Sequence, residues 1–422
     1  MRYPDSMPLL LPRLVPAYPA LLVAAALSPA FATAQDALSR AGLSLACPVD
    51  RGDTLASVPA DAAFLQGQAT TLTRFELRFG EDVPAVAQAA LRFAADVWGA
   101  HLDSPEPVVV DVDWRDRDDP RLLASAGPST LFRDFAGGRP GVWYPVALAE
   151  AIAGRGLNDA DDADIRIVVN SEADWYFGTD AAPPRGQTDL VTVALHELGH
   201  GLGFISSADT LRGVEAVIGF TGRFLVYDLF LEERGRAVTD PLNFANPGQL
   251  LLAALTADEL VFAGPTVFDV NGGAPAPMYA PAEFDPGSSV SHFDERSFPT
   301  GSSEALMTPS LARGEAIHRP GDLALALLAD LGWVVRFDLA SGATAPTFAR
   351  ALRAYPSPVS ETVWVRDWPA DLPARLLDAR GAALRVVSPA ELLEGLVVDA
   401  LAAGVYHLVG ADGNTGARFV VR

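Results

Sequence analysis

The stretch Val191–Phe204 reads VTVALHELGHGLGF and predicts a buried helix. His196 and His200 are four residues apart, so on a helix both imidazoles lie on one face, one turn apart, and can reach one ion. Glu197 lies beside them and can take a proton from a water molecule held by that ion. These residue types at this spacing form the H-E-x-x-H pattern, which predicts a zinc site on a helix over residues 186–201.

The third ligand of such a site is not obvious from the residues that follow. Gly203 extends the pattern to H-E-x-x-H-x-x-G, the start of the metzincin pattern, where the chain turns sharply toward a third ligand. Three residues later stands Ser206, whose hydroxyl is a poor zinc ligand. The ligand therefore comes from farther away, or the site is inactive. Asp209 is the nearest alternative, and a gluzincin-like site would use Glu232 or Glu233.

Motifs far downstream offer a better candidate. Ser291–Glu295 reads SHFDE, Glu304–Pro309 reads EALMTP, and Asp322–Trp333 is an amphipathic pattern that ends in DLGW. Together with HELGHGLGF, these motifs resemble the leishmanolysin-type metzincins over about residues 164–333. The chain resembles bacterial secreted relatives in particular, in which WYFG and DLVTVALHELGHGLGF also occur together.

This resemblance implies a complete catalytic set. His292 is then the third zinc ligand, which arrives after a long insertion, and Met307 lies beneath the metal in a Met-turn. The cofactor is Zn²⁺, Glu197 is the general base, and the chain is a zinc metalloendopeptidase that acts on protein or peptide substrates. Leishmanolysins proper are rich in disulfides, whereas this chain has one cysteine, so their loop structure does not transfer.

Composition narrows the class of partner. The 422 residues are 50% hydrophobic, which is typical of globular protein, and the net charge is −22 with every basic residue an arginine. An acidic surface argues against binding to nucleic acid or to anionic membranes. The single cysteine, Cys47, excludes an intrachain disulfide. Lipidation of Cys47 and a cysteine switch on the zinc are two alternatives for its role.

The N-terminus has the features of an export signal. Residues 1–34 contain Arg2 and Arg13, an apolar run at 20–27, and an A-x-A cleavage site at Ala32–Ala34. The alternative is a membrane anchor, but this run is short, and no later stretch reaches ~18 apolar residues. We expect a secreted or cell-surface chain without a transmembrane segment after processing. Residues 35–70 are weakly patterned and predict a pro-segment or a linker.

The pattern between residues 71 and 339 predicts an α+β catalytic domain. Strands and helices alternate, which favours a mixed sheet with the zinc helix packed against it. A further helix is expected to begin at Thr256, and His101, His318 and His407 are expected at the surface or in caps. The predicted strands are 72–79, 108–114 and 164–170, and the predicted helices are 84–101, 147–153, 186–201 and 322–333.

The last part of the chain predicts a separate small module. Residues 340–350 form a small-residue linker, and residues 351–422 predict a β-sandwich of short strands. Its motifs resemble, in order, the C-terminal sorting domain of the type 9 secretion system, which implies the secretion machinery as a partner. A generic immunoglobulin-like appendage is the alternative. For the whole chain, the alternative function is a surface adhesin or binding protein with a relic metal site.

Overall fold

The computed structural model describes most of the chain after the predicted signal peptide. The described residues are 36–39, 45–119, 121–339, 350–355, 359–366, 368–377, 383–402, 404–411 and 415–421. The predicted signal peptide, residues 1–34, and nearly all of the predicted linker, residues 340–349, lie outside this range. Among the described residues, helices and strands are mixed, which confirms the α+β class. No helix among them is long and apolar enough to cross a membrane.

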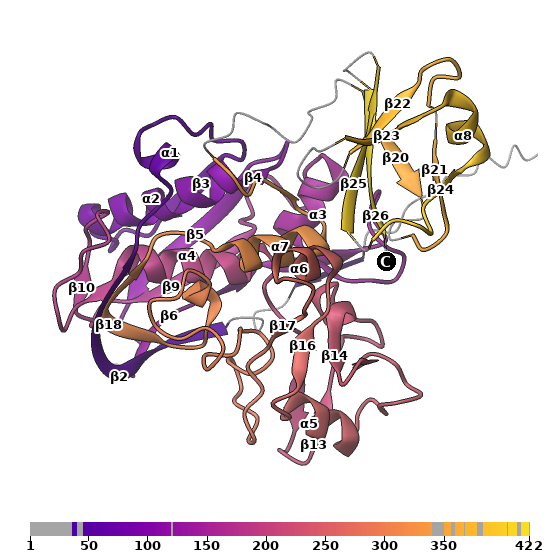
Figure 1. The fold of residues 1–422 in the computed structure, drawn as a ribbon. Coiled ribbons are helices and arrows are strands. Elements are labelled where there is room, and N and C mark those ends of the chain that lie inside the picture. Colours follow the sequence, from indigo (N-terminus) through magenta and orange to yellow (C-terminus); the bar gives the residue numbers. More distant parts are fainter. Residues whose placement is uncertain are drawn as a thin grey trace, which may run out of the picture. The chain divides into compact units, whose positions relative to one another are not determined.

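A six-stranded mixed sheet organises the first part of the chain (Figure 1). The strands β3, β5 and β9 run parallel, and β6 is antiparallel to β9. β2 is antiparallel to β6 and parallel to β18. The strands in sheet order are β18 (Leu311–Ile317), β2 (Leu45–Val58), β6 (Leu122–Pro128), β9 (Ile165–Asn170), β5 (Val108–Arg115) and β3 (Phe75–Phe79).

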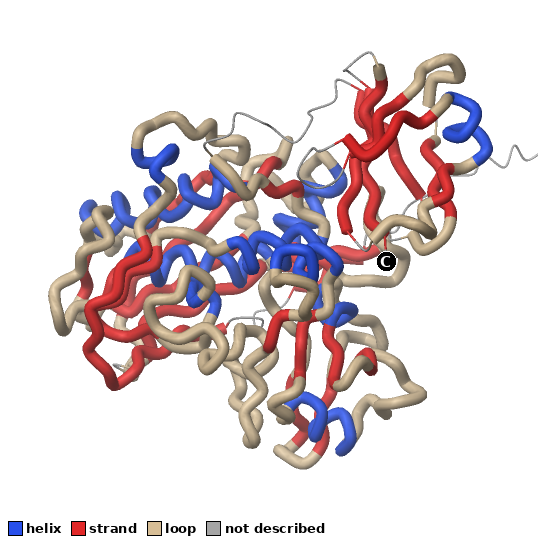
Figure 2. The backbone as a smooth tube through the Cα atoms, viewed as in Figure 1, coloured by secondary structure: helices blue, strands red, loops and turns tan. Residues whose placement is uncertain are grey.

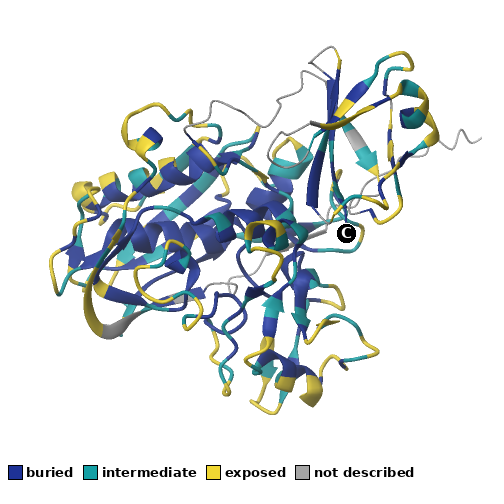
Figure 3. Cartoon of the chain, in the orientation of Figure 1, coloured by how far each residue is buried: buried dark blue, intermediate teal, exposed yellow. Residues whose placement is uncertain are grey.

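The helix α4 (Leu190–Leu202) carries the H-E-x-x-H motif and lies at the centre of the core. The Asp189 side chain caps its start by accepting the Thr192 N–H, and Gly203, at φ 123°, ends it. All of α4 is buried (Figure 3), between α2 (Ala85–His101) and the strands β6 and β9. A Cβ at Gly201 would lie 2.4 Å from Ile165, so glycine lets the helix approach the sheet.

The segment after α4 is long and contains mostly turns and short elements (Figure 2). The sequence predicts a helix that begins at Thr256, but no helix begins there. Thr256 instead ends α5 (Gln249–Leu255), and the apolar residues that follow form the strand β16 (Leu260–Phe262). The pattern was too short to separate helix from strand, and pairing of β16 with β14 (Leu231–Glu233) decides it.

Residues 35–70 are not simply a linker. Leu45–Val58 forms β2, an inner strand of the six-stranded sheet, and Asp36–Ser39 forms β1, which pairs with β7 (Thr130–Arg133). Ala62–Leu65 forms a short helix, α1. Leu45–Val58 is part of the sheet rather than a linker, because its residues 45–48 pair with β6 and its residues 49–58 pair with β18.

The remaining elements of the first part are short. Four strands pair in the order β15-β14-β16-β17. The bounds are β4 (Leu102–Asp103), β8 (Tyr144–Pro145), α3 (Val146–Ala153), β10 (Trp175–Tyr176), β11 (Thr188–Asp189), β12 (Asp209–Leu211), β13 (Glu215–Val217), η1 (Tyr227–Phe230), β15 (Arg236–Ala237), α6 (Pro265–Val270), β17 (Ala276–Pro277), η2 (Ala305–Met307), α7 (Asp322–Leu331) and β19 (Val334–Val335).

The C-terminal part forms a seven-stranded sheet with a hydrophobic cluster of its own, which includes Phe419 and Leu376. The helix α8 (Pro389–Glu394) begins with a capping box at Ser388. The strands in sheet order are β23 (Ala383–Val387), β22 (Ala374–Leu377), β25 (Gly404–Gly410), β26 (Thr415–Val421), β20 (Arg350–Tyr355), β21 (Thr362–Val365) and β24 (Leu396–Val397).

Candidate metal centre

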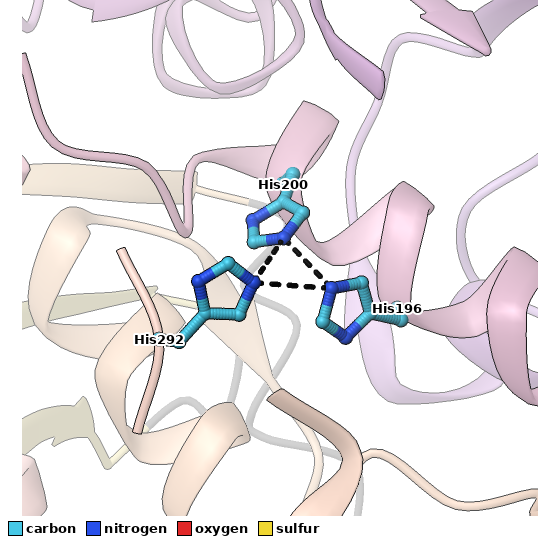
Figure 4. Close-up of side chains that lie close together, drawn as sticks. All are labelled: His196, His200 and His292. Atoms are coloured by element: carbon cyan, nitrogen blue, oxygen red, sulfur yellow. Dashed lines mark hydrogen bonds between the residues drawn. The ribbon is translucent and has the colours of Figure 1, made fainter. Parts of the chain in front are cut away.

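The imidazoles of His196, His200 and His292 meet at one point (Figure 4). Their Nε2 atoms are 2.9 Å apart for His196 and His200, 3.1 Å for His200 and His292, and 3.3 Å for His292 and His196. His196 and His200 extend from α4, whereas His292 comes from a separate loop. All three are buried. The structure thus brings together the three residues that the sequence proposes as ligands.

The other ring nitrogen of each histidine fixes its tautomer. In each ring the Nδ1 atom lies 2.7 Å from a backbone carbonyl oxygen. The carbonyl is that of Leu306 for His196, of Phe204 for His200 and of Ser288 for His292. A carbonyl oxygen only accepts hydrogen bonds, so each Nδ1 carries the proton and donates it. In a neutral ring, Nε2 is then an acceptor with a lone pair that points into the shared space.

Burial keeps these rings neutral. It lowers the pKa of His196 to about 4 and that of His292 to about 3. Burial also lowers the pKa of His200 well below its usual value, and the two neighbouring imidazoles add to this. Three neutral rings with Nδ1–H leave three acceptors facing one another and no proton between them. Such an arrangement is unfavourable unless a cation occupies the shared space.

The donor set fits Zn²⁺. With Zn–N bonds of about 2.0–2.1 Å and tetrahedral angles, ligand nitrogens lie about 3.3 Å apart. The Nε2 distances of 2.9, 3.1 and 3.3 Å are at or slightly below that value. Nδ1–H bonds to backbone carbonyls are also the usual outer support of zinc-bound histidines.

Glu197 lies beside the three imidazoles without joining them. Its side chain is fully buried, and neither carboxyl oxygen has a hydrogen-bonding side chain as partner. Burial raises its pKa well above the usual value, while the backbone of Ala126 and the charge of Arg117 act in the opposite direction. Ligand-type atoms of Cys47, His196 and Glu197 lie within 4.8 Å of one another. A cation at the imidazoles would favour the ionised carboxylate.

Met307 packs against α4, the helix that carries His196 and His200. It is fully buried, and a Cβ at Gly199 would lie 2.7 Å from its sulfur. Gly199 stands between the two helical histidines, so the absence of a side chain there gives Met307 its place. The preceding residue, Leu306, supplies the carbonyl that holds His196. The turn at residues 305–307 therefore supports the site through both backbone and side chain.

Backbone bonds hold the loop that carries His292. The Tyr279 N–H donates to the carbonyl of His292 at 2.8 Å, and the Phe293 N–H donates to the carbonyl of Met307 at 2.8 Å. The Ser206 N–H donates to Ser291 Oγ at 3.0 Å. Ser206 therefore does not join the three imidazoles but fastens the loop of His292 to the turn after α4, a role that no sequence pattern predicts.

The alternative third ligands are not part of the triad. Asp209 is exposed and its carboxylate accepts its neighbour's N–H. Glu233 pairs with Arg236, and neither it nor Glu232 belongs to a metal-type cluster among the described residues.

The other histidines differ from expectation. His101 and His318 are fully buried, so placing them at the surface is wrong. The His101 Nδ1 lies 2.8 Å from the carbonyl of Arg336, and the His318 Nε2 lies 2.8 Å from Asp189. Both partners are distant in sequence, which is why the sequence pattern did not reveal them. His407 is half-buried in β25.

Comparisons with known proteins add little to this geometry. A family model described as SPBPB7E8-like matches residues 144–224, which include α4 and both of its histidines. The match covers less than half of the chain and ends before His292. No curated protein and no solved structure matches the chain.

Proposed function

We propose that this protein is a secreted zinc-dependent endopeptidase of the leishmanolysin-like metzincin type. The observation that carries the proposal is the convergence of three Nε2 acceptors beside a buried carboxyl group that has no side-chain partner. A structural role alone would not place three acceptors together without a donor. The resemblance to that family implies a methionine beneath the metal, and the packing of Met307 against Gly199, between the two helical histidines, supports this role.

The chemistry divides among few residues. His196, His200 and His292 would hold the zinc ion, and their carbonyl partners keep the Nε2 atoms aimed at it. When bound, the ion polarises a peptide carbonyl and lowers the pKa of a water molecule to about 7. Glu197 takes the proton of the attacking water at its carboxylate and passes it to the leaving amine nitrogen.

We further propose that residues 1–34 direct export and that residues 351–422 form a type 9 sorting domain with a β-sandwich fold. The order of the C-terminal motifs and the separate hydrophobic cluster of that part support this. Deletion of residues 351–422 should leave zinc binding intact and retain the protein inside a host that has this secretion system. Equal secretion with and without these residues would contradict the sorting role.

Metal analysis of the purified chain tests the central proposal. We expect about one zinc ion per chain in the wild type, by elemental mass spectrometry, and a large loss of zinc in the His292→Ala variant. The matched control is His407→Ala, which changes a histidine outside the cluster and should keep the zinc. A zinc-free wild type, or equal zinc in all three proteins, would favour an adhesin with a relic site.

The role of Glu197 needs a separate measurement. The Glu197→Gln variant keeps the size of the side chain and should keep the zinc ion. Hydrolysis of casein should fall by about 10²–10⁴-fold, which is the usual contribution of a general base. Undiminished casein cleavage by this variant would assign proton transfer to another group.

A further inference from the structure

One residue in the loop that carries His292 has an unusual backbone conformation. Val290 has φ 72°, which lies in the left-handed region. For a β-branched residue this conformation is strained, because its Cβ lies too close to the following carbonyl oxygen. Such strain persists only where the surrounding structure enforces it. The contacts of Val290 therefore show what holds the loop in its shape.

The left-handed residue lies within the turn that supports the third imidazole. The carbonyl of Ser288 accepts the Nδ1–H of His292 at 2.7 Å, so the ring bonds to the backbone four residues before it. Val290 is midway between these two residues, and its φ contributes to the bend that brings them together. If Val290 relaxed to a negative φ, the chain would change direction between the support and the ligand. The place of the His292 ring thus depends on the conformation of Val290.

Both backbone polar groups of Val290 are hydrogen-bonded. Its N–H donates to the carbonyl of Tyr279 at 2.8 Å, and its carbonyl accepts the hydroxyl of Tyr227 at 2.9 Å. The first bond joins two backbones, so any residue at position 279 can accept it. The second bond needs a tyrosine hydroxyl, from a side chain 63 residues earlier in the chain. Tyr227 is therefore the side chain on which the conformation of Val290 depends.

The surroundings of Tyr227 give its hydroxyl a fixed place. Tyr227 belongs to η1 and is fully buried. Its ring packs against Phe262 of β16 and against Phe204, with ring centroids 5.3 Å and 5.7 Å away. Burial raises the pKa of Tyr227 well above its usual value, so the hydroxyl keeps its proton and donates it to Val290.

The ring of Tyr227 also contacts the support of a second imidazole. The carbonyl of Phe204 accepts the Nδ1–H of His200 at 2.7 Å, and the ring of the same Phe204 packs against Tyr227. Tyr227 thus contacts the turn after α4 through its ring and the loop of His292 through its hydroxyl. One side chain links the supports of two imidazoles that are far apart in the sequence.

We propose that Tyr227 is a positioning residue of the candidate metal centre, whose hydroxyl holds Val290 in the left-handed conformation and thereby fixes the ring of His292. This inference rests on the zinc site of the proposed function. The hydroxyl acts through the backbone of the loop and not on the ion or the substrate. Without it, the strain at Val290 is released, and the His292 Nε2 moves away from the other two.

The test compares two variants of the full chain that each lose one hydroxyl group. Tyr227→Phe keeps the buried ring and removes only the bond to Val290. The matched control is Tyr406→Phe in β25, which removes a hydroxyl bond of 2.8 Å to the carbonyl of Ala402. Both changes should lower stability against urea to a similar small extent. A difference at the metal centre is then not an effect of global stability.

Hydrogen exchange of the chelated proteins reports on the loop without any metal. We expect peptides that cover residues 286–294 to exchange about 10-fold faster in Tyr227→Phe than in the wild type. Zinc affinity, titrated against a chromophoric chelator, should fall about 10-fold. The visible spectrum of the cobalt(II) form should also change, because it depends on the geometry of the ligands. Tyr406→Phe should match the wild type in all three measurements.

A glycine at position 290 tests the role of strain. Glycine adopts φ 72° without crowding, so the bond from Tyr227 matters less in Val290→Gly. In a double-mutant cycle, loss of the hydroxyl should therefore reduce zinc affinity less in Val290→Gly than in the wild type. An equal reduction in both backgrounds would overturn the inference. If Val290→Gly does not fold, because a buried side chain is lost, Tyr227→Phe and Tyr406→Phe still decide.

These measurements separate the inference from the proposed function. Unchanged hydrogen exchange at residues 286–294 in Tyr227→Phe would reject the inference, whether or not the protein binds zinc. Faster exchange with unchanged zinc affinity would also reject it, because the ring of His292 would not depend on the loop. If the wild type binds no zinc and the loop exchanges faster in Tyr227→Phe, the peptidase proposal fails and the hold of Tyr227 on Val290 stands.

Discussion

The contact between Gly199 and Met307 predicts that a single added methyl group weakens metal binding. In Gly199→Ala, the new Cβ would lie 2.7 Å from the sulfur of Met307 and 3.0 Å from its terminal carbon. Ordinary contact requires about 3.5–4.0 Å. Because Met307 is fully buried, it must move into packed surroundings. Overpacking costs about 1–3 kcal/mol, against a gain of about 1 kcal/mol from replacing glycine in a helix.

The net loss in the free energy of unfolding is therefore about 0–2 kcal/mol. The effect on metal should be larger, because the shift reaches Leu306, whose carbonyl holds the Nδ1–H of His196 at 2.7 Å. Loss of such outer support costs about 10–100-fold in metal affinity. The assays are urea unfolding of the chelated protein and zinc titration against a chromophoric chelator.

A double-mutant cycle shows whether the contact is the cause. Met307→Ala removes the colliding atoms, so Gly199→Ala should cost less in that background than in the wild type. The matched control is Gly201→Ala, whose methyl would meet Ile165 at 2.4 Å and not Met307. Its cost should be the same in both backgrounds. Additive effects for Gly199 and Met307, or unchanged zinc affinity in Gly199→Ala, would refute the reasoning.

Three further predictions address the ligand loop, the pH dependence and the metal. Ser291→Ala leaves the buried Ser206 N–H without its acceptor. The free energy of unfolding should therefore fall by about 1–3 kcal/mol, and the zinc affinity should fall about 10-fold. Unchanged values in urea unfolding and zinc titration would contradict this. Burial raises the pKa of Asp164 from 3.8 to about 7, so the folded state keeps a proton that the unfolded state releases, and stability is lost as pH rises from about 4 to 7. Asp164→Asn should therefore gain roughly 3–4 kcal/mol relative to wild type across that window in pH-dependent unfolding, and a constant difference would exclude Asp164 as the cause. Chelation should lower the Tm of the wild type by several degrees in calorimetry. A similar decrease in the Tm of His292→Ala on chelation would mean that the ion lies elsewhere.

The strongly patterned elements could be predicted from sequence. Amphipathic spacing placed α2, α4 and α7, although α4 begins at Leu190 and not at Gly186, because Thr188–Asp189 forms the strand β11. Alternation placed β3 and β9. The helical spacing of His196 and His200 needed no tertiary information. His292 could be proposed only from a resemblance, because local pattern says nothing about which distant loop reaches the helix.

The sequence does not predict the strands β2, β6 and β18, because these segments lack a local strand pattern. β6 reads LLASAGP, and its alanine, glycine and proline have low strand propensity. β2 contains Pro48, Gly52 and three aspartate or arginine residues, and its strand conformation depends on pairing with β6 and β18. β18 reads LARGEAI and includes a glycine at φ 81°. For such segments, tertiary pairing overrides propensity, and sequence patterns alone cannot supply it.

The distance in sequence between the imidazoles has a consequence for biosynthesis. His292 lies 92 residues after His200 and is held by backbone bonds to segments on both sides of it. A nascent or partly translocated chain that has exposed α4 still lacks the third nitrogen and the turn that carries Met307. If the protein is the peptidase proposed above, a ribosome or a membrane channel never meets a working enzyme, because activity arises only after more than two-thirds of the polypeptide has emerged and folded.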